Sequence, residues 1–495
     1  MRNPLPLARP ASAAPHQRLK PAEPDAGPPL ARPHRALLLV LSATMLIDAL
    51  EVSVVVVALP SIAGPSIAGP SIGGGLRMPL SAAQWLMSGF ALGFGGMLLF
   101  GGRVVDQLGQ RRVYLVALLC YAALCVVSGL APNAGALIVS RVGRGCCAAL
   151  TAPTGLAIIA RTFPEGAARN RALAVYAAFG ASGFTAGLLL SGLLTEISWR
   201  WTLMFPAPVA LAIAAVAWRA IPRAHPGPGK RYDAGGALTL AGGAALLVYA
   251  IATAPEHDWP VTAAAAAIAA ALLAGFVLIE RGVRDPLLPL RLLSHGTLTR
   301  AGLAAAALNG SYWGLLLIAT FRLQDGLGWR PLPTALAFLP ASVPPMLAAP
   351  FSRHLVRWLG ARRLVIAGLL VATAGYVVAL ANPPKTYLTG FLPVLLLVGV
   401  GYVGAFSALH VHALSGVPAD AARTATGVYQ SLVQIGGALV LAVVTALSAS
   451  YRPVFAAITA VSALGVAAAV AAVAGRNDHA EEPAGGARYK NPGTR

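Results

Sequence analysis

Four ionisable side chains stand inside apolar segments of the sequence, where they could bind and release a proton. Asp48 and Glu51 lie three residues apart in the first apolar segment. The same spacing separates Arg141 and Arg144 in the fourth segment, and it places both members of a pair on one face of a helix. Burial favours a neutral acid while a nearby arginine favours the carboxylate, so such a set can change its protonation with its surroundings. A charge cluster that only orients the helices is the alternative.

The apolar segments predict a membrane protein built of helices. Hydrophobic residues make up 57% of the 495 residues and charged residues only 11%, against roughly 25% charged residues in soluble domains. About 20 apolar residues cross a bilayer as a helix. We therefore predict an all-α, polytopic protein with 14 transmembrane helices, which are expected at 36–59, 82–100, 113–130, 136–160, 172–194, 204–221, 235–254, 261–279, 301–321, 332–350, 364–381, 391–411, 424–447 and 453–474.

The positions of the basic residues predict how the chain is oriented. Most of the 37 Lys and Arg fall in the tails and in the loops on one side of the predicted helices, and such loops face the cytoplasm. We therefore expect a multi-pass protein of the cell (plasma or inner) membrane, with a disordered tail at 1–35 and a second tail at 475–495, both in the cytoplasm. The net charge of +20 then reflects this orientation and gives no reason to expect a nucleic-acid partner.

Three motifs resemble those of the fourteen-helix drug:proton antiporters in the major facilitator superfamily. Residues 50–60 (LEVSVVVVALP) resemble the first-helix signature, with Glu51 at the usual aspartate position. Residues 137–145 (LIVSRVGRG) resemble the fourth-helix motif, in which Arg144 replaces the usual glutamine. The resemblance implies that Arg141 takes part in proton coupling. Because a second buried cation needs a partner, we expect Asp48 to pair with Arg144.

The third motif, residues 102–112 (GRVVDQLGQRR), resembles the hallmark loop between helices 2 and 3 of the superfamily. The resemblance implies a charged contact that controls the rocking of the two halves. Gln107 and Gln110 occupy two positions where the pattern is basic. The residues that we expect to form this gate are Gly102, Asp106, Gly109, Arg111 and Arg112.

Glycines in the fifth predicted helix match the family's antiporter motif and favour export. They are Gly180, Gly183, Gly187 and Gly192. Leu188 stands at the proline of the motif, and Ser191 at one of its glycines. Close helix packing also explains small residues at these spacings. A proton symporter or uniporter of a small metabolite, and a non-transporting receptor or scaffold, therefore stay open.

The resemblance further implies the major facilitator fold in a 6+2+6 arrangement. Two six-helix halves, 36–221 and 301–474, would surround a small-molecule cavity, with two additional helices within 222–300 between them, and we expect a monomer. Side chains of the ninth and thirteenth helices could line the cavity, namely Asn309, Tyr312, Trp313, Tyr429, Gln430 and Gln434. Hydrogen bonds between helices are the competing explanation for these residues.

Sequence motifs for covalent chemistry are missing. The sequence contains no Walker A loop, no HExxH and no GxSxG, so we expect no enzyme, cofactor or metal and infer that an ion gradient drives transport. A five-residue repeat fills the first outer loop, with PSIAG at 60–64 and 65–69 and PSIGG at 70–74. Because proline interrupts helices, we expect an extended or turning segment there.

Overall fold

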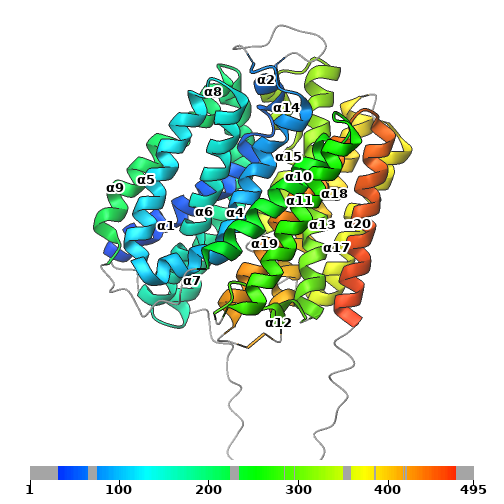
Figure 1. Ribbon diagram of the computed structural model, residues 1–495. Coiled ribbons are helices and arrows are strands. Elements are labelled where there is room, and N and C mark those ends of the chain that lie inside the picture. The colour runs from blue at the N-terminus through cyan, green and yellow to red at the C-terminus, as the bar shows by residue number, and fades with distance from the viewer. Residues whose placement is uncertain are drawn as a thin grey trace, which may run out of the picture.

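The computed structural model describes residues 32–64, 75–222, 233–283, 285–294, 296–348, 358–383, 386–415, 417–418 and 421–474. Most of both predicted tails and the repeats at 65–74 lie outside these residues. The described chain contains helices and no strand. Its helices stand side by side in one bundle, and its first and last helices begin and end at the same end of that bundle, which is called the lower end here (Figure 1).

The first half of the chain forms a group of long helices in which α1 packs against α7 and α4 packs against α6. The elements are α1 (Arg32–Val54), α2 (Leu59–Ala63), α3 (Leu80–Ala83), α4 (Trp85–Leu108), α5 (Gln110–Gly129), α6 (Ala134–Thr162), α7 (Ala167–Thr195), α8 (Trp199–Met204) and α9 (Pro206–Ala220). Glycines bring α4 and α6 into backbone contact. A Cβ on Gly93 would lie 2.2 Å from the carbonyl oxygen of Val142, and one on Gly145 would lie 2.2 Å from that of Phe90.

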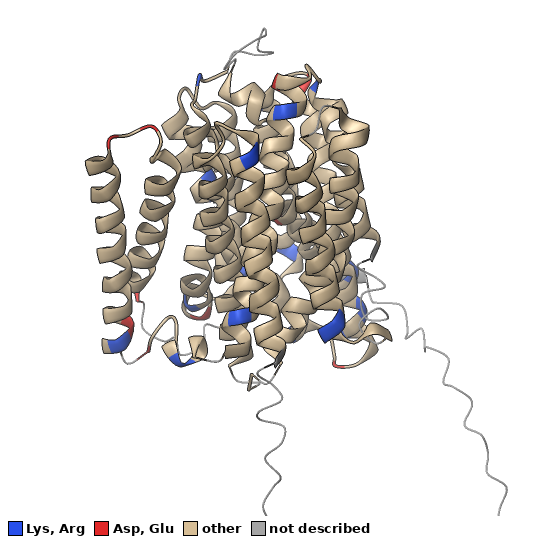
Figure 2. Ribbon diagram, turned by 90° about the vertical axis from the view of Figure 1, so that its right-hand side faces the viewer, with Lys and Arg blue, Asp and Glu red and all other residues tan. Residues whose placement is uncertain are grey.

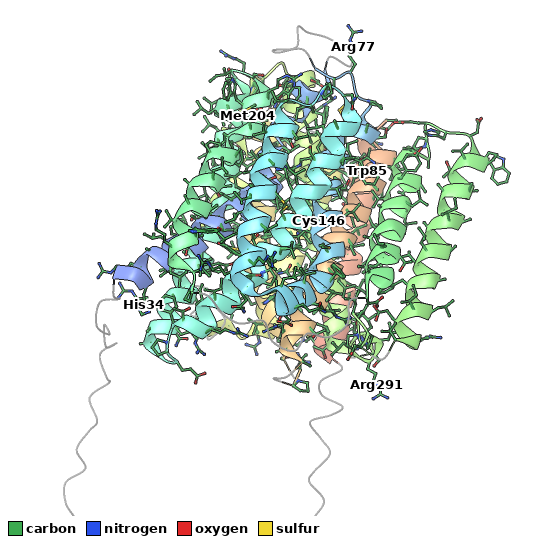
Figure 3. All side chains as sticks on the ribbon, turned by 60° about the vertical axis from the view of Figure 1, so that its left-hand side comes forward. His34, Arg77, Trp85, Cys146, Met204 and Arg291 are labelled. Carbon is green, nitrogen blue, oxygen red and sulfur yellow. The ribbon has the colours of Figure 1, made fainter. Side chains whose placement is uncertain are left out.

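In the second half, α13 lies at the centre and packs against α18, α19 and α20. The elements are α10 (Ala234–Thr253), α11 (Trp259–Gly282), α12 (Leu290–Leu293), α13 (Gly296–Phe321), η1 (Arg322–Gly326), α14 (Pro331–Ala337), α15 (Leu339–Ala348), α17 (Ala361–Ala381), η3 (Tyr387–Phe391), α18 (Leu392–Leu414), α19 (Ala422–Ala446) and α20 (Tyr451–Ala474). The pair α10 and α11 lies at the side of the bundle (Figure 3). Of the two, α10 contacts both α4 and α19.

Within the described part of the chain, 13 helices are long and apolar enough to cross a membrane. Figure 2 shows most charged residues at the two ends of the bundle, as a bilayer requires. The protein is therefore a multi-pass membrane protein. The predicted span at 332–350 is divided into two short helices, α14 and α15, which meet at Phe338. Prolines at 331, 333, 340, 344 and 345 remove backbone donors there, and the broken pair occupies the place of the remaining predicted span.

The first proline repeat also differs from its prediction. Residues 60–63 belong to the short helix α2, in which Pro60 stands in the first turn. A proline is tolerated at this position because the first backbone N–H groups of a helix have no partner within it. The chain leaves α2 at Gly64, whose φ of 85° favours glycine.

Candidate functional site

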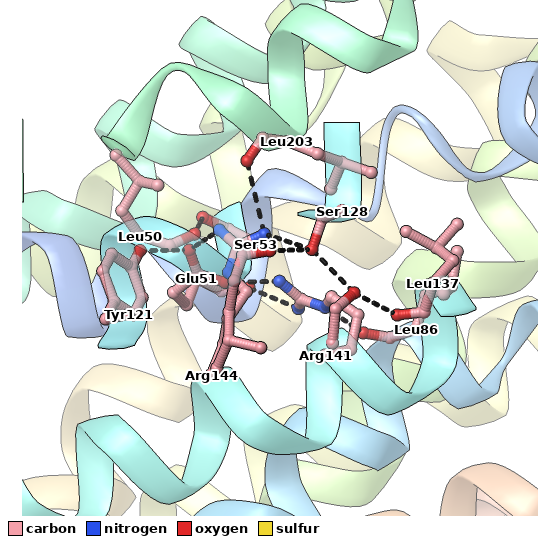
Figure 4. A network of polar contacts seen from close by, with 12 residues as sticks. Leu50, Glu51, Ser53, Leu86, Tyr121, Ser128, Leu137, Arg141, Arg144 and Leu203 are labelled. Atoms are coloured by element: carbon pink, nitrogen blue, oxygen red, sulfur yellow. Dashed lines mark hydrogen bonds and ion pairs between the residues drawn. The ribbon is translucent and has the colours of Figure 1, made fainter. Parts of the chain in front are cut away.

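The glutamate of α1 and the two arginines of α6 meet inside the first half of the bundle (Figure 4). Arg141 Nη1 and Arg144 Nη2 each form an ion pair with one carboxylate oxygen of Glu51. Tyr121 of α5 donates its hydroxyl to the same carboxylate. All three charged side chains are 0% exposed, so the predicted charge set faces the protein interior and not the lipid.

The two arginines differ in how well their other groups are bonded. Arg141 Nε donates to the backbone oxygen of Leu86 at 2.8 Å, and its Nη2 donates to the backbone oxygen of Glu51 at 3.0 Å. Arg144 Nη1 has only long contacts, to Ser128 Oγ at 3.5 Å and to the backbone oxygen of Leu203 at 3.4 Å. Its Nε has no hydrogen-bond partner. Arg144 therefore depends on Glu51 more than Arg141 does.

Asp48 lies one turn before Glu51 and has a different environment. Its Oδ2 accepts a hydrogen bond of 3.0 Å from Thr151 Oγ1 of α6, and the residue is 9% exposed. The ion pairs of the described residues include none to Asp48. The prediction that Asp48 pairs with Arg144 is therefore wrong. Thr151 lies two turns beyond Arg144 on α6, so the turn of α1 that carries Asp48 faces a hydroxyl and not a guanidinium group.

The acid of the hallmark loop connects the two halves of the chain. Asp106 is near the end of α4, and its Oδ1 accepts a hydrogen bond of 3.2 Å from Arg423 Nη1 at the start of α19. This ion pair is half exposed, with 47% of the Asp106 side chain and 65% of the Arg423 side chain accessible. The basic partner comes from the second half of the sequence, and sequence reasoning did not assign it to the gate.

Of the other predicted gate residues, Arg111 and Gly109 have structural roles within the first half. The described residues give no contact that requires Gly102 or Arg112. Arg111 donates to the backbone oxygen of Trp218 at the end of α9, and its guanidinium lies 5.4 Å from the centroid of that ring. Gly109 has a φ of 85° and joins α4 to α5. A Cβ on Gly102 would meet no atom within 4 Å, so packing does not require that glycine. Arg112 is exposed.

The glycines of α7 allow close contacts, most of them with α1. A Cβ on Gly183 would lie 2.5 Å from the backbone oxygen of Leu46, and one on Gly187 would lie 2.1 Å from Ser53 Oγ. At Gly180 the nearest atom belongs to the flexible side chain of Met45. Gly192 instead faces Ala335 of α14, at 2.5 Å. Three of the four predicted glycines therefore position the helix that carries Glu51, and the fourth contacts the second half.

Part of the predicted cavity residues form an aromatic cluster where α7 meets α13 and α18. The ring of Tyr312 lies 5.7 Å from that of Phe184 and 5.1 Å from that of Tyr402. The Tyr402 hydroxyl donates to Asn309 Oδ1 at 3.2 Å, and Phe406 stacks on Tyr402 at 5.0 Å. Phe184, Tyr402 and Phe406 were missed because nothing in the sequence separates them from ordinary core aromatics. The four-residue spacing of Tyr402 and Phe406 places both rings on one helix face, but core aromatics often have the same spacing.

The other predicted cavity residues lie along α13 and α19. Trp313 is buried, and its ring lies 3.1 Å from the position of a Cβ on Gly437. Tyr429 packs edge-on against His410, with 5.0 Å between the ring centroids. Its hydroxyl is buried without a hydrogen-bond partner, as is that of Tyr376 on α17. Gln430 and Gln434 are half-buried, and the Cβ of Gln434 lies 3.1 Å from the Cβ position on Gly95 of the first half.

A family model described as "Major Facilitator Superfamily" matches residues 41–441. The chain belongs to this superfamily. Among its relatives are a puromycin resistance protein of Streptomyces alboniger (35% identical, covering 83% of this chain and 81% of the relative) and the cephamycin export protein CmcT of Amycolatopsis lactamdurans (33% identical, covering 84% and 85%). Both relatives are named for resistance to an antibiotic or for its export.

Solved structures show the same fold. The POT family transporter PepTSo gives a TM-score of 0.66 with 14% identity, covering 91% of this chain and 99% of that structure. The xylose transporter XylE from E. coli gives a TM-score of 0.61 with 14% identity, covering 89% and 97%. The predicted all-α, major facilitator fold is confirmed. As a member of this superfamily, the protein is a membrane transporter.

The two halves of this superfamily transporter are also connected at the upper end of the bundle. Glu196, which caps α7, accepts a hydrogen bond of 3.1 Å from the backbone N–H of Leu332 and forms an ion pair with Arg330. Gln324 Nε2 donates to the backbone oxygen of Val57 at 2.9 Å. Together with Asp106 and Arg423 at the lower end, these contacts hold the halves together at both ends of the bundle. The predicted spans leave Glu196, Gln324 and Arg330 in loops, and sequence reasoning found no contacts for them.

Proposed function

We propose that this transporter exports small amphiphilic, drug-like molecules from the cell in exchange for protons. Two relatives named for puromycin resistance and cephamycin export, and a third named as a tetracenomycin C resistance and export protein of Streptomyces glaucescens, support export of such molecules. The observation that carries proton coupling is the buried acid Asp48, one helical turn from the fully buried ion pairs of Glu51 with Arg141 and Arg144. Charges in a membrane span are costly and mark transport and proton pathways.

The proposed architecture has two moving halves and a fixed orientation. Residues 36–221 and 301–474 rock against each other, with α10 and α11 within 222–300 beside them. The lower end, with both termini, faces the cytoplasm, and the protein works as a monomer. The lower contact of Asp106 with Arg423 and the upper contact of Glu196 with Arg330 then break in turn. Such alternation around a midplane site is how secondary transporters of this design move their substrates.

Of the two carboxyl groups in α1, we assign proton uptake to Asp48. Glu51 accepts hydrogen bonds from two guanidinium groups and from Tyr121. Protonating Glu51 would leave two buried cations without their acid, which is strongly unfavourable. Asp48 accepts one hydrogen bond, from the neutral Thr151, and its protonation leaves no cation unpaired. Glu51 therefore stays ionised and anchors the arginines, and Asp48 changes its protonation during the cycle.

We place the substrate beside the aromatic cluster of Phe184, Tyr312 and Tyr402. These residues come from both halves, so a molecule between them would separate contacts that the halves now make. Aromatic faces bind apolar rings and organic cations. Asn309 and the two buried hydroxyl groups of Tyr376 and Tyr429 offer polar contacts that fix orientation.

Transport by the purified protein in liposomes tests proton coupling and the direction of transport. Puromycin serves as the probe, with cephamycin C and tetracenomycin C as second and third probes. A pH gradient imposed across the membrane should drive accumulation of at least one probe against its concentration gradient, and a protonophore should abolish that accumulation. Uptake in the same direction as the protons would show a symporter. Transport that ignores the pH gradient would refute proton coupling.

The matched variants Asp48→Asn and Glu51→Gln distinguish the roles of the two acids in transport. Asp48→Asn should abolish pH-driven accumulation but retain exchange of labelled for unlabelled probe across the membrane, because exchange needs no net proton movement. Glu51→Gln should impair both, since it disturbs the packing of α1 and α6. Normal pH-driven accumulation by Asp48→Asn would refute the assignment of the proton to Asp48.

A further inference from the structure

A second pair of buried acids lies at the lower end of α10 and α11, outside the site described above. Asp233 precedes α10 and is 7% exposed, and Glu280 lies near the end of α11 and is 4% exposed. Each acid uses one oxygen in a hydrogen bond. Asp233 Oδ1 accepts from the backbone N–H of Gly236 at 2.8 Å and caps α10. Glu280 Oε2 accepts from the backbone N–H of Leu288 at 3.2 Å.

The other oxygen of each acid is buried and has no hydrogen-bond partner in the part of the chain that the structure describes. Asp233 Oδ2 and Glu280 Oε1 are both in this state. Both oxygens face the same small space, because they lie 2.6 Å and 3.0 Å from the position of a Cβ on Gly236. An unpaired buried oxygen is unfavourable, and two ionised carboxylates at such a place also repel each other.

One proton between the two acids removes both the repulsion of the two carboxylates and the cost of the unpaired buried oxygens. It neutralises one charge, and it supplies a donor for the two buried oxygens that lack a hydrogen-bond partner among the described residues. The described residues contain no group of three or more His, Cys, Asp or Glu that could hold a metal ion.

Charged groups of the neighbouring helices surround this pair. Arg103 of α4, within the hallmark loop motif, acts electrostatically on Glu280, as does Asp233. On α11, Arg281 follows Glu280 and is exposed, and Asp285 is half-buried beyond it. The charged contact that α19 brings to this end is the ion pair of Arg423 with Asp106. Because Arg103 and Asp106 lie one turn apart on α4, a change of charge at the acid pair acts on the helix end that holds the gate.

We propose that Asp233 and Glu280 form a second proton-binding site, in which the two carboxyl groups share one proton next to the lower gate. The site would respond to the pH at the lower end of the bundle. The helix α10 contacts α4 of the first half and α19 of the second, and a Cβ on Gly96 of α4 would lie 2.8 Å from the Cβ of Ala241. Movement of the two halves therefore changes the surroundings of the pair, and this coupling is additional to the Asp48 exchange.

Infrared spectroscopy of the purified protein tests the shared proton directly, without any substrate. At neutral pH the spectrum should contain a protonated carboxyl band that is lost in Glu280→Gln and lost or shifted in Asp233→Asn, but kept in Asp48→Asn. Arg281→Gln, a change at an exposed neighbour, is the matched control and should keep the band. A spectrum unchanged by both acid substitutions would overturn the proposal. A band that disappears on replacing choline by sodium or potassium would show a metal cation in place of the proton, and would also overturn it.

Puromycin export at clamped pH tests the response to one side. In the wild type, export should vary with the pH at the lower end. Glu280→Gln should flatten that dependence while the dependence on the pH at the upper end persists, and Glu280→Asp should restore part of it. An unchanged dependence on lower-side pH in Glu280→Gln would overturn the proposal. Loss of all pH-driven transport in the wild type itself would refute the proposed function and leave the infrared result standing.

Discussion

Replacing Glu51 by glutamine tests whether one acid holds two buried cations. The substitution keeps the shape of the side chain but leaves Arg141 and Arg144, both 0% exposed, without a counter-charge. Removing one partner of a buried ion pair typically costs about 3–5 kcal/mol. Arg141 keeps the backbone oxygens of Leu86 and residue 51, whereas Arg144 keeps only contacts of 3.4 and 3.5 Å. We therefore expect Glu51→Gln to lose about 3–5 kcal/mol of stability, mostly through Arg144.

The double variant Glu51→Gln/Arg144→Gln distinguishes this cause from loss of packing. It removes the cation that has the poorer contacts, so it should be more stable than Glu51→Gln alone although it carries one more substitution. Thermal melting of the purified protein, followed with a dye that reacts with its buried cysteines, gives the order. We expect the wild type to melt highest, the double variant next and the single variant lowest. A single variant that melts like the wild type, or a double variant below the single, would refute the reasoning.

Two further sets of substitutions test contacts between helices, the first at the glycines of α7 and the second at the ion pair of Asp106 with Arg423. Gly187→Ala should lower the melting temperature more than Gly180→Ala, by an amount equivalent to about 1–3 kcal/mol, because a Cβ would meet Ser53 Oγ at 2.1 Å in the first case and the movable end of Met45 at 2.9 Å in the second. Equal melting temperatures would contradict this. Loss of the half-exposed contact of Asp106 with Arg423 should change the export rate by less than about tenfold, since such pairs contribute about 0–1 kcal/mol. Exchanging the two charges, as Asp106→Arg/Arg423→Asp, should restore the rate, and a swap no better than either single variant would show that the pair does not form the gate.

Features that depend on local periodicity were predictable from the sequence. Apolar length determines where a helix can cross a bilayer, and the described residues contain 13 such helices. The spacing of three predicted that Arg141 and Arg144 share a face, and both indeed bind Glu51. Membrane burial leaves a charge few choices of partner, so composition and spacing already limit the possible contacts.

Features that depend on helix register and on distant contacts were not predictable. Whether Arg144 meets Asp48 or Glu51 is decided by a shift of one helical turn between α1 and α6, which no local pattern fixes. Arg423 meets Asp106 across 317 positions of sequence, and many exposed arginines could have done so. The break at Phe338 between α14 and α15 depends on how packed neighbours compensate for prolines, because membrane helices often tolerate them.

The replacement of the usual glutamine by Arg144 explains why the two acids of α1 can have different roles. With glutamine at this position, Glu51 would face a single guanidinium group, and its protonation would leave one cation unpaired. With Arg144, the same event leaves two unpaired, so the carboxylate becomes harder to neutralise. The proposed proton exchange then needs another acid nearby. Asp48 lies one turn away, buried and bonded only to Thr151, and it can therefore be neutralised without disturbing the ion pairs. On this argument Arg144→Gln should make Glu51 a competitor of Asp48 for the proton.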